Sequence, residues 1–214
     1  MTKTSDLLRQ GRTDEIWNKY CGFLDLDVAG FMEIQKRLLV EQIALLSKCE
    51  LGLRLLGGDV PKDIEEFRRF TPLTTYEDYA PYLGPKQDEI LPSKPVWWLH
   101  TSGKSGYGFK WVPFSQEAIS KLGECGMAGM VLGSSSRRGD FHYEVGDTLL
   151  CSVAPFPYIS GALAIAFEKE FEFVFLPSLE EADKLGFQER VQTGFQMSMR
   201  SGLDAFFGVA SVLA

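Results

Sequence analysis

The chain has 214 residues, of which 45% are hydrophobic and 24% are charged, proportions that are typical of a globular protein with a sizeable core. Its 22 Lys and Arg residues and 29 Asp and Glu residues give a formal net charge of −7, which argues against bulk binding of nucleic acid or of an anionic membrane, so any phosphate site must be local. Residues 1–14 are polar, and no apolar run approaches the roughly 20 residues that span a bilayer, so we expect a cytoplasmic protein without a signal peptide or a membrane partner.

Residues 1–92 are predicted to form a helical N-terminal segment that packs on the rest of the chain. Its main helix is expected over residues 28–56, because apolar side chains recur there at spacings of three, four or seven. Gly57 and Gly58 follow, as is common at a helix end. The apolar stripe consists of Met32, Leu39, Ile43, Leu46 and Leu53.

Two shorter helices are predicted within the same segment. One should occupy residues 63–70, just after Pro61, since proline is well tolerated where a helix begins. The other is expected over residues 76–82, with Thr75 as the capping residue whose hydroxyl satisfies a free backbone amide. Packing, rather than chemistry, is the expected role of nearly all of this segment.

The most informative stretch lies further along the chain. An apolar run at 96–99 predicts a buried strand, a loop of small and hydroxyl residues follows at 101–108, and a second strand-like run covers 109–113. Glycines let backbone amides approach a ligand closely, while hydroxyls and lysines add donors and positive charge, a combination that suits a polyphosphate. The candidate phosphate-binding residues are Thr101, Ser102, Gly103, Lys104, Ser105, Gly106, Gly108 and Lys110.

Two alternative interpretations apply to this loop. The letters G-K-S at 103–105 occur in a Walker P-loop, but that motif needs a glycine where this chain has Trp98, and it needs a helix rather than a strand after the loop. The other alternative is a flexible hairpin loop that binds nothing, since segments rich in Gly and Ser are common turns. The residues of the loop alone leave this second alternative open.

Residues 93–214 are predicted to form an α/β part that carries the phosphate loop. Strands alternate there with helices, which indicates a mixed or parallel sheet with crossover helices. The expected elements are a helix from Ser115 to about residue 132, a strand over 148–153, a helix over 161–167, a strand over 171–176, a helix over 180–200 and a strand over 205–209. Residues 134–144 are polar and predicted to be an exposed loop. Gly126, Gly129 and Gly133 are expected to allow close packing of the first helix against the sheet.

A turn after the strand over 148–153 is a candidate ligand pocket. It contains proline, aromatic and glycine residues, and ligands of α/β folds sit at the carboxyl ends of strands. The candidate pocket residues are Tyr158, Ser160 and Gly161. A rigid turn without a ligand explains the same residues.

No catalytic residue and no metal ligand is assigned. His100 is interpreted as an imidazole hydrogen-bonded at a strand end, with a polar contact in an active-site cleft as the alternative, and His142 as an exposed side chain. The four cysteines have no C-x-x-C spacing and are expected to be buried, reduced thiols. Glu180, Glu181 and Asp183 are interpreted as a solvated helix start.

Several motifs in the same order resemble the adenylate-forming superfamily. Thr101, Ser102, Gly103, Ser105, Gly106 and Lys110 fit its phosphate loop, roughly T-S-G-T-T-G-x-P-K, although one extra residue precedes the lysine and Lys104 stands where Thr or Ser is usual. That longer spacing is closer to the plant auxin-responsive acyl-acid amido synthetases and their bacterial relatives. The lead-in F-R-R-F-T-P-L-T-T-Y-E-D-Y at 67–79 also resembles phenylacetate-CoA ligases, and the segments at 91–95, 146–155 and 158–161 fit as well.

The resemblance implies that ATP, as its Mg²⁺ complex, activates a carboxylic acid as an acyl-adenylate, followed by transfer to CoA or to an amino acid. It also implies that the segment at 155–161 borders the acyl pocket. The later family motifs for adenine, ribose and magnesium, and the mobile domain with a catalytic lysine, lie beyond the matched segments. We therefore expect this chain to be part of the large N-terminal domain, inactive by itself, and to need a C-terminal half or to associate with a copy of itself.

The alternative is a non-catalytic fragment or interaction module that keeps the fold with weak or no nucleotide binding. The sequence leaves open which acid is used, and whether CoA or an amino acid is the acceptor. The role of Lys104 is open too: it could bind phosphate as a point charge or extend into solvent.

Overall fold

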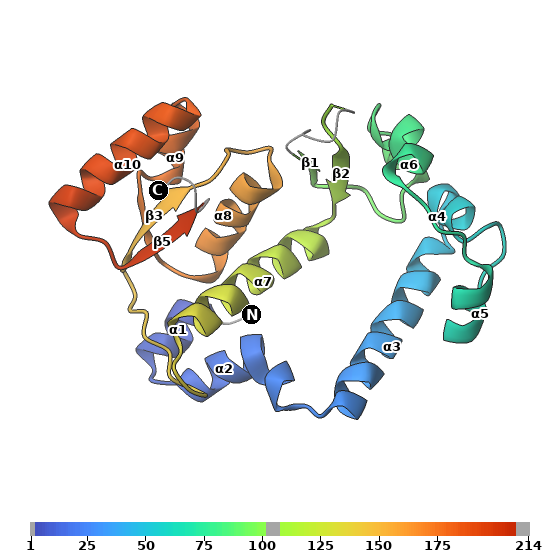
Figure 1. Cartoon of the computed structure of the whole chain (residues 1–214), viewed down its shortest axis with the longest axis horizontal. Helices are drawn as coiled ribbons and strands as arrows, with labels where there is room; N and C mark the ends of the chain where they lie inside the picture. The colour runs from blue at the N-terminus through green and yellow to red at the C-terminus, as the bar shows by residue number, and fades with distance from the viewer. Residues whose placement is uncertain (1–2, 102–107, 209–214) are drawn as a thin grey trace. The chain divides into compact units, whose positions relative to one another are not determined.

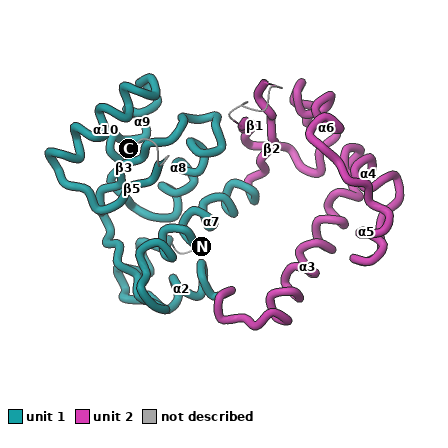
Figure 2. The backbone as a smooth tube through the Cα atoms, viewed as in Figure 1, with its two compact units in different colours: residues 1–22, 117–214 teal, residues 23–116 magenta. Residues whose placement is uncertain are grey.

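The computed structural model describes residues 3–101 and 108–208, which divide into two compact units that are treated separately (Figure 2). Unit 1 takes in residues 1–22 and 117–214, and unit 2 takes in residues 23–116. The domain boundary expected near residue 92 stays a prediction. Within the described ranges, no helix combines the length and the apolar character that crossing a bilayer requires.

Unit 2 is mainly helical and carries one hairpin (Figure 1). The short 3-10 helix η1 (Gly22–Asp25) leads into it. Its elements in the described part of the chain are α3 (Val28–Leu46), α4 (Glu50–Leu55), α5 (Ile64–Phe70), α6 (Tyr76–Leu83), the 3-10 helix η2 (Asp88–Ile90), β1 (Trp97–His100) and β2 (Trp111–Phe114).

The single helix expected over residues 28–56 is in fact two helices, so its predicted extent is wrong. Helix α3 ends at Leu46, and α4 begins at Glu50 after a tight turn. Cys49 caps α4, because its Sγ accepts a hydrogen bond from the Gly52 amide at 3.3 Å. A Cβ built on Gly52 would lie only 2.0 Å from the Leu46 carbonyl oxygen, so the turn depends on a residue without a side chain.

The two shorter helices of unit 2 form where they were predicted. Asp63 caps α5 by accepting a hydrogen bond from the Glu66 amide at 2.8 Å. Thr75 caps α6 in a reciprocal capping box, in which the Asp78 carboxylate accepts a hydrogen bond from the Thr75 amide at 2.6 Å. Both caps satisfy backbone amides that have no partner inside the helix.

Strands β1 and β2 confirm the predicted strands on either side of the Gly/Ser-rich loop. They pair antiparallel, in a register that sets Trp97 opposite Phe114 and His100 opposite Trp111. In the described part of the chain they form a two-stranded sheet of their own. The candidate loop therefore connects two adjacent strands that are hydrogen-bonded to each other.

Unit 1 contains a small sheet surrounded by helices (Figure 1). Its described elements are α1 (Thr4–Arg9), α2 (Thr13–Cys21), α7 (Gln116–Ser134, of which Gln116 belongs to unit 2), β3 (Thr148–Ser152), α8 (Ile159–Glu170), β4 (Val174–Leu176), α9 (Leu179–Asp183), α10 (Phe187–Ser201) and β5 (Ala205–Gly208).

The sheet of unit 1 is parallel, as the alternation of strands and helices predicts. Within the described residues it has three strands in the order β4-β3-β5, and both pairings with the central β3 are parallel. Helix α8 connects β3 to β4, while α9 and α10 connect β4 to β5, because parallel neighbours need a crossover. This mixture of helix and parallel sheet agrees with the α/β class.

Helices cover both faces of this sheet. Leu149 of β3 belongs to a core cluster with Met127 of α7 and Phe167 of α8. Its neighbour Leu150 meets α10 instead, since a Cβ on Gly194 would lie 2.6 Å from the Leu150 Cδ1. Successive side chains of a strand point to opposite faces, so α7 and α8 lie on one side and α10 on the other.

Two glycines of α7, Gly123 and Gly126, pack against helix α8, which corrects the expectation of close packing against the sheet. A Cβ on Gly123 would lie 2.9 Å from the Ala166 carbonyl oxygen of α8, and one on Gly126 would lie 2.8 Å from a leucine methyl of the same helix. The other two, Gly129 and Gly133, meet nothing within 4 Å. Of these four glycines, only Gly123 and Gly126 are required for the close approach of α7 to α8.

The expected exposed loop over 134–144 is correct only for its first part. The ring of Phe141 stands edge-on to Phe171, with ring centroids 6.0 Å apart, and Tyr143 stands edge-on to Phe173 at 5.5 Å. These aromatic side chains pack against the core cluster of unit 1. The first residues of the loop are therefore polar, while Phe141 and Tyr143 pack against the core.

The helix expected over 180–200 is also two helices. Ser178 begins α9 with a capping box that includes Glu181, and α9 ends at Asp183. Gly186 then adopts an extended conformation, with φ −63° and ψ 159°, before α10 begins. This extended residue interrupts the helical hydrogen bonds between α9 and α10.

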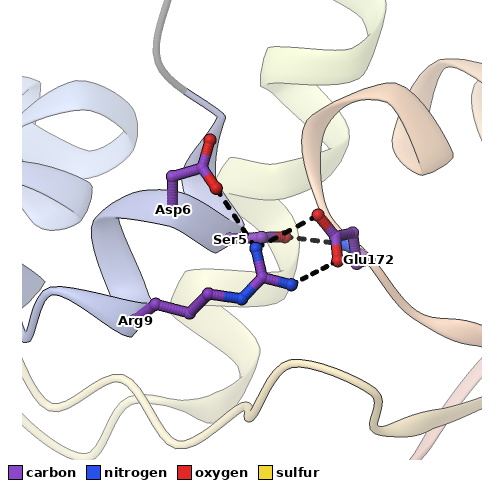
Figure 3. Close-up of polar contacts among 4 residues, drawn as sticks. All are labelled: Ser5, Asp6, Arg9 and Glu172. Carbon is purple, nitrogen blue, oxygen red and sulfur yellow. Dashed lines mark hydrogen bonds and ion pairs between the residues drawn. The ribbon is translucent and has the colours of Figure 1, made fainter.

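Helix α1 is tied to the segment just before β4 (Figure 3). The Arg9 guanidinium donates to the Glu172 carboxylate at 2.5 Å and to Asp6 at 3.1 Å. The Glu172 amide donates to the Ser5 hydroxyl at 2.9 Å. These contacts join two segments of unit 1 that are far apart in the sequence.

Candidate functional site

Only part of the predicted phosphate site falls on described residues. Ser102, Gly103, Lys104, Ser105 and Gly106 lie outside them. Thr101 directly follows β1, and Gly108 and Lys110 precede β2. The structure therefore describes both ends of the candidate loop.

The two ends of the loop are held together by the hairpin ladder. The Thr101 amide donates to the Lys110 carbonyl oxygen at 3.2 Å, which extends the β1–β2 pairing by one residue pair. Gly108 has a φ of +71°, a left-handed conformation that side chains other than glycine rarely adopt. A hydroxyl residue and a lysine thus face each other across the base of the loop.

Lys110 and the start of β2 contact helix α6. The Lys110 Nζ lies 5.5 Å from the ring centroid of Tyr76, the first residue of α6. The Tyr76 hydroxyl accepts a hydrogen bond from the Trp111 amide at 2.7 Å and lies 3.1 Å from the Trp111 carbonyl oxygen. Lys86, just after α6, lies over the Trp111 ring at 3.4 Å. Neither Tyr76 nor Lys86 was predicted to lie near the candidate site.

His100 is buried among aromatic rings at the end of β1. It is 5% exposed, with ring centroids 4.2 Å from Phe109 and 4.9 Å from Trp111. Its Nδ1 lies 3.1 Å from the Thr101 carbonyl oxygen. This arrangement agrees with the interpretation of an imidazole hydrogen-bonded at a strand end.

The predicted substrate-pocket residues lie at the beginning of α8 in unit 1. Tyr158 is the residue before the helix, and the Ser160 hydroxyl donates to the Ala154 carbonyl oxygen at 3.4 Å. Gly161 packs against the preceding turn so closely that a Cβ there would lie 2.4 Å from the Phe156 nitrogen. Gly161 also lines a cavity of about 20 Å³, room for about one water molecule.

A buried arginine lines the same cavity and was missed in the sequence. Arg190 of α10 is 5% exposed, and one of its terminal nitrogens donates to the Val153 carbonyl oxygen. Its Nε has no hydrogen-bond partner in the described structure, and burial lowers the pKa of the guanidinium. The sequence did contain a sign of its burial: Arg190 lies on the same side of the helix as Phe187 and Gly194, which are three and four residues away.

The groove beside α3 shows that the apolar stripe of that helix is not simply core. Ile43 is buried, but Met32 is 49% exposed and lines a groove of about 690 Å³ between α3 and α5. Charged residues of both signs line it together with apolar residues. The groove lining consists of Met32, Glu33, Gln35, Lys36, Leu39, Asp63, Ile64, Glu65 and Arg68.

The cysteines and His142 show no arrangement for metal chemistry. All four cysteines are free thiols, but Cys125 is exposed, which corrects the expectation that all of them are buried. His142 is 61% exposed by its side chain and lies 3.1 Å from Asp140. Among the described residues, no three His, Cys, Asp or Glu side chains gather as possible metal ligands.

Comparison with known proteins gives a family and a relative. The model of the GH3 family N-terminal domain matches residues 23–148, more than half of the chain. A probable indole-3-acetic acid-amido synthetase, GH3.4, from Oryza sativa subsp. japonica is 36% identical over 111 residues, which cover 49% of this chain and 17% of the relative. The matching part is therefore less than a fifth of that relative's length. No solved structure matches the chain significantly.

Proposed function

This chain belongs to the GH3 family, and we propose that it supplies the phosphate-binding part of an ATP-dependent ligase that activates a carboxylic acid and conjugates it to an amino acid. Family membership supports acid activation, and the printed name of the rice relative, an amido synthetase, supports an amino acid as the acceptor. CoA, the other acceptor that the sequence left open, gains no support from these matches.

One structural observation carries the proposal: the hairpin β1–β2 brings Thr101 and Lys110 together at the base of the Gly/Ser-rich loop. A hydroxyl donor, a lysine and a left-handed glycine at this position suit the β- and γ-phosphates of MgATP. When bound, MgATP would supply the adenylyl group that the carboxylate takes up with release of pyrophosphate. Lys110 would offset the negative charge of the phosphates, and Thr101 would orient them.

We also propose that the chain acts together with a C-terminal part that carries the remaining family motifs. The matched model is described as an N-terminal domain, which supports this assignment. The acyl pocket is assigned to the turn that includes Tyr158, Ser160 and Gly161, and the protein to the cytoplasm.

The test is a titration of the chain with MgATP and, separately, with AMP, followed by NMR or calorimetry. MgATP should bind more tightly than AMP, because AMP lacks the two phosphates assigned to the loop. Lys110→Ala should raise the Kd for MgATP by about ten-fold or more, the loss expected for charged hydrogen bonds. Lys48→Ala removes the same charge from an exposed position of unit 2 and should change little.

Two results would contradict the proposal. One is equal binding of AMP and MgATP. The other is an unchanged Kd for MgATP when Thr101→Ala and Lys110→Ala are combined. Either would favour the alternative of a non-catalytic interaction module.

A further inference from the structure

The outer edge of β2 is closed by a side chain rather than by a strand. In the described residues, β2 pairs only with β1, and both backbone groups of Trp111 turn to the hydroxyl of Tyr76. The Trp111 amide donates to that hydroxyl at 2.7 Å, and the hydroxyl donates to the Trp111 carbonyl oxygen at 3.1 Å. One phenol thereby satisfies a donor and an acceptor that a neighbouring strand would otherwise bond.

The ring of the same tyrosine contacts the lysine of the candidate site. Lys110 directly precedes Trp111, and its Nζ lies 5.5 Å from the Tyr76 ring centroid, within the range of a cation–π contact. A lysine side chain has many rotamers and loses conformational entropy when it is held in one place. The tyrosine thus restrains both the backbone beside Lys110 and the charged end of Lys110.

Tyr76 is itself fixed by its surroundings. It is the first residue of α6, directly after the capping box of Thr75 and Asp78. Its ring stands edge-on to Tyr79 one turn later, with centroids 6.2 Å apart at 86°. Lys86, which follows the same helix, lies over the Trp111 ring at 3.4 Å and holds β2 from a second point. Because these contacts fix Tyr76, its hydroxyl can hold the Trp111 backbone of β2 in one place.

We propose that Tyr76 is a positioning residue for Lys110: it holds the start of β2 and the lysine ammonium in the orientation that binds the phosphates of MgATP. This inference rests on the proposed function, because Lys110 is the phosphate ligand in both. Tyr76 touches no phosphate itself and acts through Lys110 and the Trp111 backbone.

A simple packing role for Tyr76 predicts a different result. Tyr76 also packs against the small apolar cluster of Leu51, Leu83 and Ile90, so its removal could weaken unit 2 in general. If Tyr76 only stabilises unit 2, the loss of MgATP affinity on its substitution should add to the loss caused by replacing Lys110. If Tyr76 positions Lys110, its substitution should cause no further loss of affinity once Lys110 has been replaced.

The experiment is a double-mutant cycle on the chain, with the Kd for MgATP as the measurement. Tyr76→Phe removes only the hydroxyl and should raise the Kd by about three- to ten-fold, the loss expected for one or two hydrogen bonds. In the Lys110→Ala background the same substitution should change the Kd by less than about two-fold. Tyr79→Phe is the matched control, since it removes a hydroxyl from the same helix, bonded at 2.5 Å to Thr74, and should leave the Kd unchanged.

Hydrogen exchange gives a second measurement that needs no nucleotide. Tyr76→Phe should speed exchange of the Trp111 amide, because the acceptor at 2.7 Å is lost, while amides in β3 of unit 1 keep their rates. Equal exchange at Trp111 in the wild type and the variant would overturn the inference.

The outcomes separate the inference from the proposed function. If MgATP binding depends on Lys110 but not on Tyr76, or if the two effects add, the inference fails and the proposed function stands. If the wild-type chain binds MgATP no better than AMP, the proposed function fails and the inference fails with it. A three- to ten-fold effect that disappears in Lys110→Ala supports both.

Discussion

Arg9 makes the ion pair that joins the N-terminal helix to the segment before β4, and it gives unit 1 a dependence on pH. The hydrogen bond from Arg9, followed by its charge, holds the pKa of the Glu172 carboxyl below its usual value. A carboxyl whose pKa is lower in the folded state stabilises the fold above its unfolded pKa, and this stabilisation is lost as the pH falls through the folded pKa.

We therefore expect Arg9→Gln to lower the melting temperature at neutral pH, and the difference from the wild type to shrink below about pH 4. Thermal unfolding followed by circular dichroism across this range would measure it. Arg12→Gln is the control, since the partner of Arg12 is Glu15, only three residues away, and that pair joins no distant segments. A difference for Arg9→Gln that stays constant down to acid pH would contradict the assignment.

The thiols differ in reactivity according to burial. Burial raises the pKa of Cys151 to about 11 and also raises the pKa of Cys21, whereas Cys125 is exposed on α7. Because the thiolate is the nucleophile, iodoacetamide should modify Cys125 first in the folded protein. Mass spectrometry of the labelled peptides would locate the modification, and Cys125→Ser should remove the fast phase. Fast labelling of Cys151 in the folded protein would contradict its burial in β3.

Single residues are predictable from the sequence where their contacts are local. Thr75 was predicted as a cap because a cap depends only on its next three residues, and the structure has it as one. Tyr76 was missed as a neighbour of the candidate site, because its partner Trp111 lies 35 residues away and nothing in the sequence pairs the two. Arg190 was missed for the same reason: its acceptor Val153 belongs to another element.

Among the helices, the predicted types were correct, but two predicted helices, over residues 28–56 and 180–200, were too long, because each is two helices in the structure. The apolar stripe continues from Leu46 to Leu53 across residues 47–49, so the pattern predicts a single helix there, and a single helix was likewise expected over 180–200. The breaks depend on contacts formed only in the fold, such as the approach of Gly52 to the end of α3. The strands expected over 148–153 and 205–209 were closer to the structure, whereas the strand expected over 171–176 begins only at Val174.

The packing of α7 on α8 gives a prediction with an internal control. Gly123→Ala should destabilise unit 1 by about 1–3 kcal/mol, because the new methyl meets the backbone oxygen of Ala166 at 2.9 Å and a backbone atom cannot move aside easily. Gly129→Ala on the same helix meets nothing within 4 Å and should stabilise it by about 0.5–1 kcal/mol through helix propensity.

Urea unfolding of the two variants beside the wild type would measure both changes in the free energy of unfolding. The opposite signs matter more than the sizes, because the substitution is the same and only the surroundings differ. Equal effects of both substitutions would mean that α7 does not approach α8 at Gly123.

Across the entire chain, the family match runs through both compact units, since residues 23–148 include all of unit 2 and continue through α7 to the start of β3. The candidate phosphate residues lie in unit 2 and the candidate acyl pocket in unit 1. Neither unit therefore contains both candidate sites. The aligned region covers only 17% of the rice relative.

We expect the chain alone to bind MgATP without catalysing acid-dependent exchange of pyrophosphate into ATP at a rate typical of an adenylate-forming enzyme. Positioning of the carboxylate and electrostatic stabilisation of the reacting phosphate supply most of the rate of such a reaction, and we assign the groups for adenine, ribose and the catalytic lysine to the C-terminal part. The measurement is the exchange of labelled pyrophosphate into ATP with a panel of aromatic and aliphatic acids, with MgATP binding measured on the same sample to show that the phosphate site is intact. Robust exchange that requires an added acid and is lost in Lys110→Ala would contradict this prediction, because residues 1–214 would then contain a complete adenylation site.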